Sequence, residues 1–289
     1  MHPVLAQLGP FTLYTYTVLI DAGIVAALAA LYLQAPATRR TLWLDTGLAA
    51  TVGGFVGARL LYVSLNANYY LPHIDEVVQV WQGGLAWPGA PAGALLGGWL
   101  YARRHGEGLA RVVDALAMPL GLLSLLSWSG CLAAGCAYGY QVTPGPLPGW
   151  LVSQAPDLYG VVAPRFPTQA LGMAWSVLAM LAIWGTLRAQ RQSSRRWAAG
   201  AVGTYALSLV ALGVFLLSFT RGDPAPLVGG FRIDVVGSAL VLVVATAAWV
   251  WRLTRAPDPA DAPEPAAQPA VTDASPPASA STADPIPDS

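Results

Sequence analysis

The chain has 289 residues, of which 55% are hydrophobic and only 10% are charged. Soluble domains carry about 25% charged residues, so this composition excludes an ordinary soluble domain and indicates a polytopic membrane protein. The formal net charge is zero, which excludes the basic surface expected of a nucleic-acid-binding protein. All 15 Lys and Arg residues are arginine, so a protein that needs a lysine Schiff base is excluded as well.

Seven apolar segments have lengths near the roughly 20 residues that a membrane-spanning helix needs. The predicted fold class is therefore all-α, a polytopic membrane protein with seven transmembrane helices. The first segment is interpreted as a retained helix rather than a signal peptide, because it lacks a basic n-region and a persuasive cleavage site. The segments cover about 11–34, 43–65, 85–102, 112–134, 168–187, 198–219 and 233–252.

The arginines predict the orientation of the chain in the membrane. Arginine clusters follow the first, third, fifth and seventh segments, and the positive-inside rule assigns these clusters to the cytoplasm. The N-terminus is then outside and the C-terminus cytoplasmic. The opposite side, which holds 66–82, 140–167 and 222–232, has few basic residues: Arg165, Arg221 and Arg232.

The last 34 residues differ in composition from the rest of the chain. From about residue 256 the sequence is rich in Pro, Ala, Ser and Asp and lacks aromatic residues. Such a segment cannot bury enough apolar surface to fold. Residues 1–255 are therefore predicted to form the seven-helix transmembrane domain, and 256–289 a disordered cytoplasmic tail.

Four ionisable residues lie within or at the edge of the predicted spans. A charge at the bilayer centre costs about 2.5–3.5 kcal/mol on insertion scales and usually faces a cavity or a partner. Arg59 either extends to the outer headgroups or holds a lipid phosphate. Asp21 would face Arg59 if the first two helices pack antiparallel at matching depths. Asp114 is expected to be solvated, and Asp234 to be an ordinary interface residue like Arg232.

Arg221 emerges on the outer side after a long apolar run, two residues before Asp223. The pair is either a loop salt bridge that contributes little or part of a phosphate anchor at a membrane-level cavity. Pro88 and Pro91 predict a broken or kinked start of the third helix. The many glycines of the second to fourth segments predict close helix packing.

Cys131 and Cys136 are the only cysteines. Their spacing of five puts them on different faces of a helix, and no second Cys or His pair is available for zinc. No metal site is therefore predicted. The cysteines are interpreted as small apolar fillers, with a disulfide in an irregular segment as the alternative.

Several short blocks resemble, in order, blocks of the prolipoprotein diacylglyceryl transferases. The resemblance covers about residues 8–250 and includes the family patterns G-G-R-x-G-Y, W-x-G-G-x-x-x-H-G-G-x-x-G, G-R-x-G-N-F-x-N-x-E-x-x-G, R-H-P-S-Q and F-R-x-P-D. The matching blocks are Leu8 to Pro10 with Tyr14 and Tyr16; Gly57 to Arg59 with Tyr62; Trp81 to Leu85 with Gly89 and Gly93; Ser127 to Gly139; Arg165 to Gln169; and Phe219 to Arg221 with Asp223.

The resemblance implies a multi-pass enzyme of the bacterial cytoplasmic (inner) membrane. It would move a diacylglyceryl group from phosphatidylglycerol to the lipobox cysteine of a prolipoprotein, in contact with membrane lipid and without a cofactor. The implied catalytic residues are Arg221 and Tyr16. The implied substrate-binding residues are Arg59, Tyr62, Gly83, Gly84, Gly89, Gly130, Gly139 and Asp223.

The chain departs from the family patterns at positions that carry chemistry. Pro88 and Phe166 stand where the patterns have histidine, and Trp128 where the signature has arginine. Cys131, Ala134 and Cys136 replace two asparagines and a glutamate, and Leu171 and Gly172 a tyrosine and a glutamate. The hypotheses are a divergent transferase, or a homologue that lost catalysis and binds phospholipid or acts as an accessory protein. An unrelated transporter is disfavoured, because the chain has no repeated halves.

Overall fold

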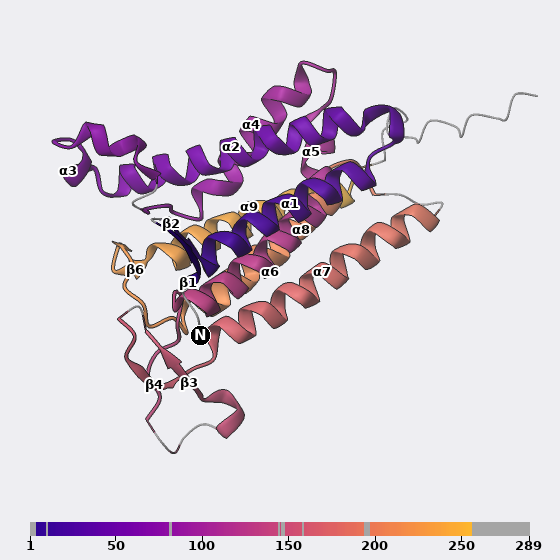
Figure 1. Ribbon diagram of the computed structural model, residues 1–289. Helices are drawn as coiled ribbons and strands as arrows, with labels where there is room; N and C mark the ends of the chain where they lie inside the picture. Colours follow the sequence, from indigo (N-terminus) through magenta and orange to yellow (C-terminus); the bar gives the residue numbers. More distant parts are fainter. Residues whose placement is uncertain are drawn as a thin grey trace, which may run out of the picture. The chain divides into compact units, whose positions relative to one another are not determined.

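The computed structural model describes residues 4–9, 11–80, 83–143, 145, 148–157, 159–193 and 197–255. The predicted tail at 256–289 lies outside the described residues, as do Trp81 and Gln82 of the third-helix block. In the described part, long helices pack side by side, and short β-hairpins lie before the first helix and in two of the segments that connect helices (Figure 1).

Six helices, counted over the described residues, are long and apolar enough to cross a membrane. They confirm a multi-pass helical protein, whereas the expected count of seven and the orientation stay predictions. The predicted third span is represented by α4, which has only 15 residues. The α-helices are α1 (Thr15–Gln34), α2 (Arg40–Leu65), α3 (Ala67–Tyr70), α4 (Gly89–Arg103), α5 (Leu109–Ala115), α6 (Ala117–Ala134), α7 (Thr168–Gln192), α8 (Ala201–Ser218) and α9 (Ile233–Leu253), with 3₁₀ turns η1 (Ala37–Arg39), η2 (Ile74–Val78) and η4 (Gly149–Leu151).

The described part of the chain has three antiparallel hairpins, one before α1 and two in segments that connect helices. The first takes residues that were expected to begin the first span, because Phe11–Tyr14 pairs with Val4–Leu8 and the helix starts only at Thr15. The third delivers Arg232 to the start of α9. The pairs are β1 (Val4–Leu8) with β2 (Phe11–Tyr14), β3 (Ser153–Pro156) with β4 (Val162–Arg165), and β5 (Leu227–Val228) with β6 (Phe231–Arg232).

Helices α2 and α4 approach each other to backbone contact. A Cβ atom added to Gly53 would lie 2.3 Å from the carbonyl oxygen of Gly93, and one added to Gly57 would lie 2.5 Å from that of Gly89. The predicted close packing is therefore confirmed, and it requires glycine on both helices. The predicted break at the start of the third helix is confirmed too, because residues 83–88 are irregular and α4 begins directly after Pro88.

Asp114 corrects an expectation. Its carboxylate is half-buried and accepts hydrogen bonds from the backbone N–H groups of Gly200 (2.6 Å) and Gly203 (2.8 Å). The first N–H groups of a helix have no partner within the helix, and α8 begins at Ala201. Asp114 therefore caps α8 from a neighbouring helix and is not a merely solvated carboxylate.

Candidate functional site

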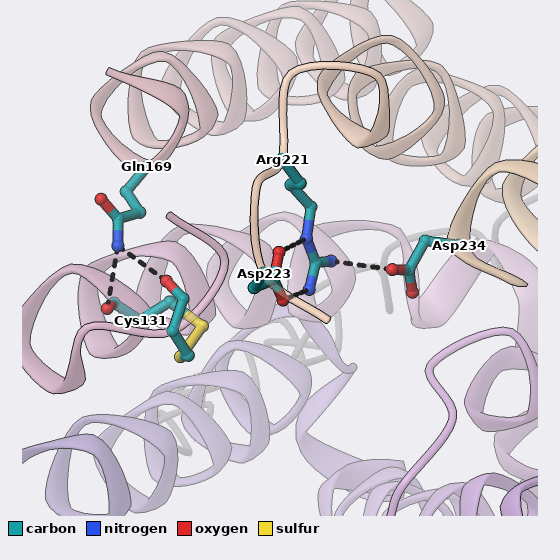
Figure 2. Close-up of a disulfide and its surroundings, with 6 residues drawn as sticks. Cys131, Gln169, Arg221, Asp223 and Asp234 are labelled. Atoms are coloured by element: carbon teal, nitrogen blue, oxygen red, sulfur yellow. Dashed lines mark hydrogen bonds and ion pairs between the residues drawn. A yellow bond between two sulfur atoms is a disulfide. The ribbon is translucent and has the colours of Figure 1, made fainter. Parts of the chain in front are cut away.

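Four charged side chains meet where α8 ends and α9 begins. We call Arg221, Asp223, Arg232 and Asp234 the arginine–aspartate cluster. Arg221 donates from Nε to Asp223 Oδ1 (2.8 Å) and from Nη2 to Asp223 Oδ2 (2.5 Å). Its Nη1 lies 3.2 Å from Asp234 Oδ2 (Figure 2). The four side chains are 14–20% exposed, so the cluster is half-buried and still reachable.

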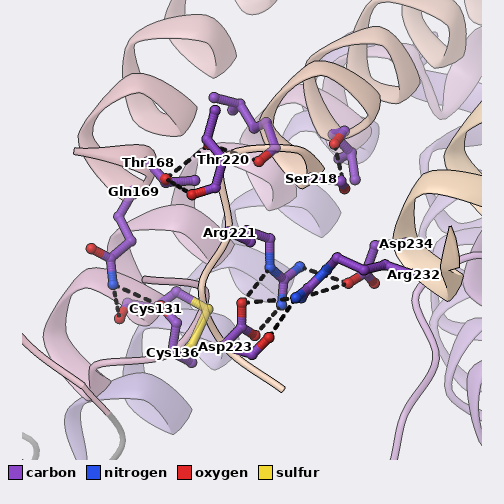
Figure 3. Close-up of polar contacts among 12 residues, drawn as sticks. Cys131, Cys136, Thr168, Gln169, Ser218, Thr220, Arg221, Asp223, Arg232 and Asp234 are labelled. Carbon is purple, nitrogen blue, oxygen red and sulfur yellow. Dashed lines mark hydrogen bonds and ion pairs between the residues drawn. A yellow bond between two sulfur atoms is a disulfide. The ribbon is translucent and has the colours of Figure 1, made fainter. Parts of the chain in front are cut away.

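Arg232 closes the cluster from the other side. Its Nη2 lies 3.2 Å from Asp223 Oδ1 and 3.5 Å from Asp234 Oδ2, and its Nη1 donates to the backbone oxygen of Asp223 (Figure 3). Its Nε is buried and has no hydrogen-bond partner among the described residues. Each carboxylate therefore bridges both guanidinium groups, so Arg232 and Asp234 are more than the ordinary interface residues that the sequence suggested.

Arg221 stays charged although it is half-buried. Burial alone would lower the pKa of its guanidinium, but the hydrogen bond to Asp223 and the attraction of Asp234 and Asp223 outweigh burial and raise that pKa above its ordinary value. A permanently charged guanidinium whose partners are carboxylate side chains can take a phosphate when a carboxylate turns aside. With both aspartates in place the cluster has no net charge, so binding of an anion requires that a carboxylate first leave its arginine.

A backbone bridge holds the chain at Arg221. Gly139 pairs antiparallel with Arg221, with hydrogen bonds from Tyr140 N to Thr220 O (3.0 Å) and from Gly222 N to Tyr138 O (2.8 Å). A Cβ atom at Gly139 would lie 2.0 Å from the carbonyl oxygen of Phe166. Gly139, a predicted site residue, is therefore needed for close approach, and the bridge brings it to Arg221.

The two cysteines form a disulfide within the segment that leads to Gly139 (Figure 2). Their interpretation as apolar fillers is therefore wrong. It assumed a continuous helix, whereas α6 ends at Ala134 and Gly135 has a left-handed φ of +75°. This reversal brings Cys136 back to Cys131, with a Cα–Cα distance of 4.6 Å.

Tyr16 and Gly130 are brought together. Tyr16 lies in the first turn of α1, and a Cβ atom at Gly130 would lie 3.0 Å from Cδ2 of its ring. Gly130 directly precedes Cys131, so α1 contacts α6 beside the disulfide. The contact is between the ring and the backbone and assigns no role to the hydroxyl group of Tyr16.

Arg59 has a different environment. Its side chain donates to five backbone carbonyls: Nε to Val77 (2.8 Å), Nη1 to Gly83 (2.6 Å) and Gly84 (3.0 Å), and Nη2 to Glu76 (2.7 Å) and Gln79 (3.4 Å). A guanidinium group has five N–H donors, so none remains for a phosphate. The prediction that Arg59 binds a lipid phosphate is not supported by this geometry, and with 5% exposure it does not extend to the headgroups either.

Other predicted residues gather around Arg59. Gly83 and Gly84 supply carbonyls, and the ring of Tyr62 lies 6.0 Å from the Arg59 guanidinium carbon. Asp21 is exposed on α1, and within the described residues the guanidinium group is bonded to carbonyls rather than to Asp21. Asp21 and Arg59 therefore do not form the expected pair.

The chain is similar in sequence to a family of transferases. The family model described as prolipoprotein diacylglyceryl transferase matches residues 3–251. The chain belongs to this family. A phosphatidylglycerol–prolipoprotein diacylglyceryl transferase of Geobacillus kaustophilus is 30% identical over 86% of this chain and 92% of that protein. One of Symbiobacterium thermophilum is 27% identical over 90% and 96%, and one of Frankia alni 31% identical over 84% and 64%.

In this member of the transferase family, Trp128 and Pro88, which depart from the family patterns, pack against glycines. A Cβ atom at Gly172 would lie 2.2 Å from Cδ2 of the Trp128 indole, and one at Gly237 would lie 2.2 Å from Cγ of Pro88. Gly89, the neighbouring predicted residue, contacts Gly57 of α2. The positions that the family resemblance assigns to an arginine and a histidine are thus filled by tightly packed apolar side chains.

The sequence did not predict that Arg232 and Asp234 join Arg221 in this cluster or that Gln169 bonds to the disulfide segment. Arg232 lies 11 residues from Arg221, with a hairpin between them that carries no strong turn signal beyond Gly229 and Gly230. Gln169 is 3% exposed, and a buried amide needs partners. Its place in the R-H-P-S-Q block was the available signal.

Proposed function

We propose that this protein transfers the diacylglyceryl group of phosphatidylglycerol to the thiol of a lipobox cysteine, with Arg221 as the cation at the leaving phosphate. The observation that carries the proposal is the arginine–aspartate cluster, in which the charged Arg221 is half-buried and bonded to carboxylate side chains rather than to the backbone. The names of the relatives supply the substrate pair.

In the proposed reaction the substrate thiolate attacks the glycerol carbon that bears the phosphate. A C–S bond forms, the C–O bond breaks, and glycerol phosphate leaves with the electron pair. N–H groups of Arg221 stabilise the charge on that phosphate. When the phosphate takes one face of Arg221, the released Asp223 carboxylate accepts the proton of the thiol.

The same proposal includes the setting of the protein. We place it in the bacterial cytoplasmic membrane, with the N-terminus and the cluster outside and the residues after Leu253, including the 256–289 tail, in the cytoplasm. The disulfide supports this orientation, because disulfides persist in oxidising compartments. The arginine distribution supports it independently.

The test is a transfer assay with purified protein, phosphatidylglycerol micelles and a lipobox peptide, with the thioether product measured by mass spectrometry. Wild type is expected to alkylate the peptide, and Arg221→Ala to lose at least about 10²-fold in rate. Arg191→Ala, an exposed arginine near the end of α7, is the matched control and keeps full activity. No product from wild type overturns the proposal.

A second function is favoured by the apolar filling at Pro88 and Trp128. A family member that has lost catalysis would bind phospholipid without making a thioether. In that case wild type retains phosphatidylglycerol through purification, Arg221→Ala loses it, and neither makes product. Product formation by wild type excludes this alternative.

A further inference from the structure

The disulfide and the arginine–aspartate cluster are connected through a short, continuous set of contacts. Cys136 is followed by Ala137, which is buried at a φ of +50°, and then by the Tyr138–Tyr140 segment. A non-glycine residue at positive φ is strained and persists only where its surroundings hold it. The disulfide ends one residue before this strained position, so it is one of the constraints that hold the turn.

Gln169 ties the disulfide to α7. Its Nε2 donates to the backbone oxygen of Cys136 (2.7 Å) and to that of Cys131 (3.3 Å), as Figure 3 shows. Next to it, Thr168 bonds through Oγ1 to Oγ1 of Thr220 (2.9 Å). The first turn of α7 therefore contacts the cystine on one side and the residue before Arg221 on the other.

The segment after the disulfide forms the backbone bridge to Arg221. Tyr138 and Tyr140 exchange hydrogen bonds with Gly222 and Thr220, the two chain neighbours of Arg221. The bridge thereby fixes the position of the Arg221 backbone relative to the segment that follows α6. The aspartates bind the guanidinium end of the side chain, so the backbone end depends on this bridge.

We propose that the Cys131–Cys136 disulfide is a positioning device for Arg221, so that the outer site of this protein works only in its oxidised form. Reduction by a phosphine or dithiol opens the bond to two thiols, and the reductant is oxidised in turn. The turn at 131–137 then loses its covalent closure, the 138–140 bridge loosens, and Arg221 moves out of position. The expected effect of reduction on the transfer rate rests on the proposed function. The expected effect of reduction on the backbone bridge does not.

The experiment uses the full chain in micelles, before and after treatment with the phosphine TCEP. Hydrogen exchange by mass spectrometry follows the amides of Tyr140 and Gly222, and the transfer assay follows activity. We expect reduction to speed exchange at both amides about tenfold and to lower the transfer rate roughly ten- to hundredfold. Removal of TCEP and reoxidation restores both values.

The controls separate the disulfide from other effects. Because the chain has two cysteines, a C131S/C136S variant has no thiol of its own and should behave like reduced wild type with or without TCEP. It also reports any action of TCEP on the peptide. The amides of Gly200 and Gly203, which bond to Asp114, should exchange at the same rate throughout.

Unchanged exchange at Tyr140 and Gly222 after reduction overturns the inference. The inference is also overturned if reduction speeds exchange at these amides but leaves the transfer rate unchanged. Arg221 would then not depend on the bridge. If C131S/C136S fails to fold, reduction of folded wild type gives the same comparison. If oxidised wild type makes no product, the proposed function fails, and the exchange rates still decide whether the disulfide holds the bridge.

Discussion

Arg59 and Arg221 were both expected to bind the phosphate of a lipid. Their surroundings in the structure differ. Arg59 is buried and gives all five N–H groups to backbone carbonyls. Arg221 is half-buried and bonds to the carboxylates of Asp223 and Asp234. Carbonyls belong to a fixed backbone, whereas carboxylates turn aside by side-chain rotation. An arginine held by carbonyls therefore stabilises a loop, whereas one held by carboxylates can exchange a carboxylate for an anion, which is the role we propose for Arg221.

The largest expected effect of this difference is on folding at Arg59. Arg59→Ala removes the donor of five part-buried hydrogen bonds to carbonyls of residues 76–79 and 83–84, and hydrogen bonds to a charged group contribute about 1.5–3 kcal/mol each. We expect a loss of stability of at least about 4 kcal/mol, measured as the folded fraction by size exclusion and thermal unfolding. Arg191→Ala is the control. Arg59→Ala protein that unfolds like wild type would show that the carbonyl contacts do not stabilise the loop.

A smaller effect is expected at Gly139, on the Arg221 side. Gly139→Ala puts a Cβ atom 2.0 Å from the Phe166 carbonyl oxygen, and a forced backbone shift costs about 1–3 kcal/mol. Stability and transfer rate should fall together, measured by thermal unfolding and the peptide assay. Gly149→Ala is the matched control, since a Cβ atom there would have no atom of the described residues within 4 Å. Equal behaviour of the two variants would argue against the bridge.

Asp234→Asn tests the difference between Arg59 and Arg221, because it gives the arginine–aspartate cluster a net positive charge. The asparagine keeps the shape but releases part of the attraction on Arg221 and Arg232. Anion binding should therefore tighten about tenfold, as expected for a charge-assisted bond that no longer competes with a carboxylate. Inhibition of transfer by glycerol phosphate measures it. An unchanged inhibition constant would mean that the carboxylates do not compete with anions.

The smallest expected effect is that of pH through Arg221. Its raised pKa gives a stabilisation that is present below the unfolded pKa and is lost only as pH rises through the still higher folded pKa, far above working pH. Arg221 therefore does not titrate between pH 6 and 9. The pH–rate profiles of wild type and Arg221→Lys should have the same steps in this range. Measured profiles of the two proteins check this, and a step that disappears in Arg221→Lys would contradict the assigned charge state.

Local features of the sequence were enough for much of the fold. The apolar segments, the break at Pro88 and the glycine contacts of α2 with α4 depend on runs of neighbouring residues, so pattern alone predicted them. The salt bridge of Arg221 with Asp223 was among the expected alternatives, because the two residues are two positions apart.

The partners of the site came from tertiary structure. Arg232 and Asp234 reach Arg221 because a hairpin turns the chain back, and Cys131 meets Cys136 because Gly135 ends a helix in a left-handed conformation. Arg59 is satisfied by carbonyls, which every residue carries and which no sequence pattern distinguishes. The sequence by itself determined that the chain is a multi-pass helical protein and which residue types are available for a site, but its count of seven spans stays a prediction. Only the folded backbone decided which donor meets which acceptor, because hydrogen bonds depend on distance and direction.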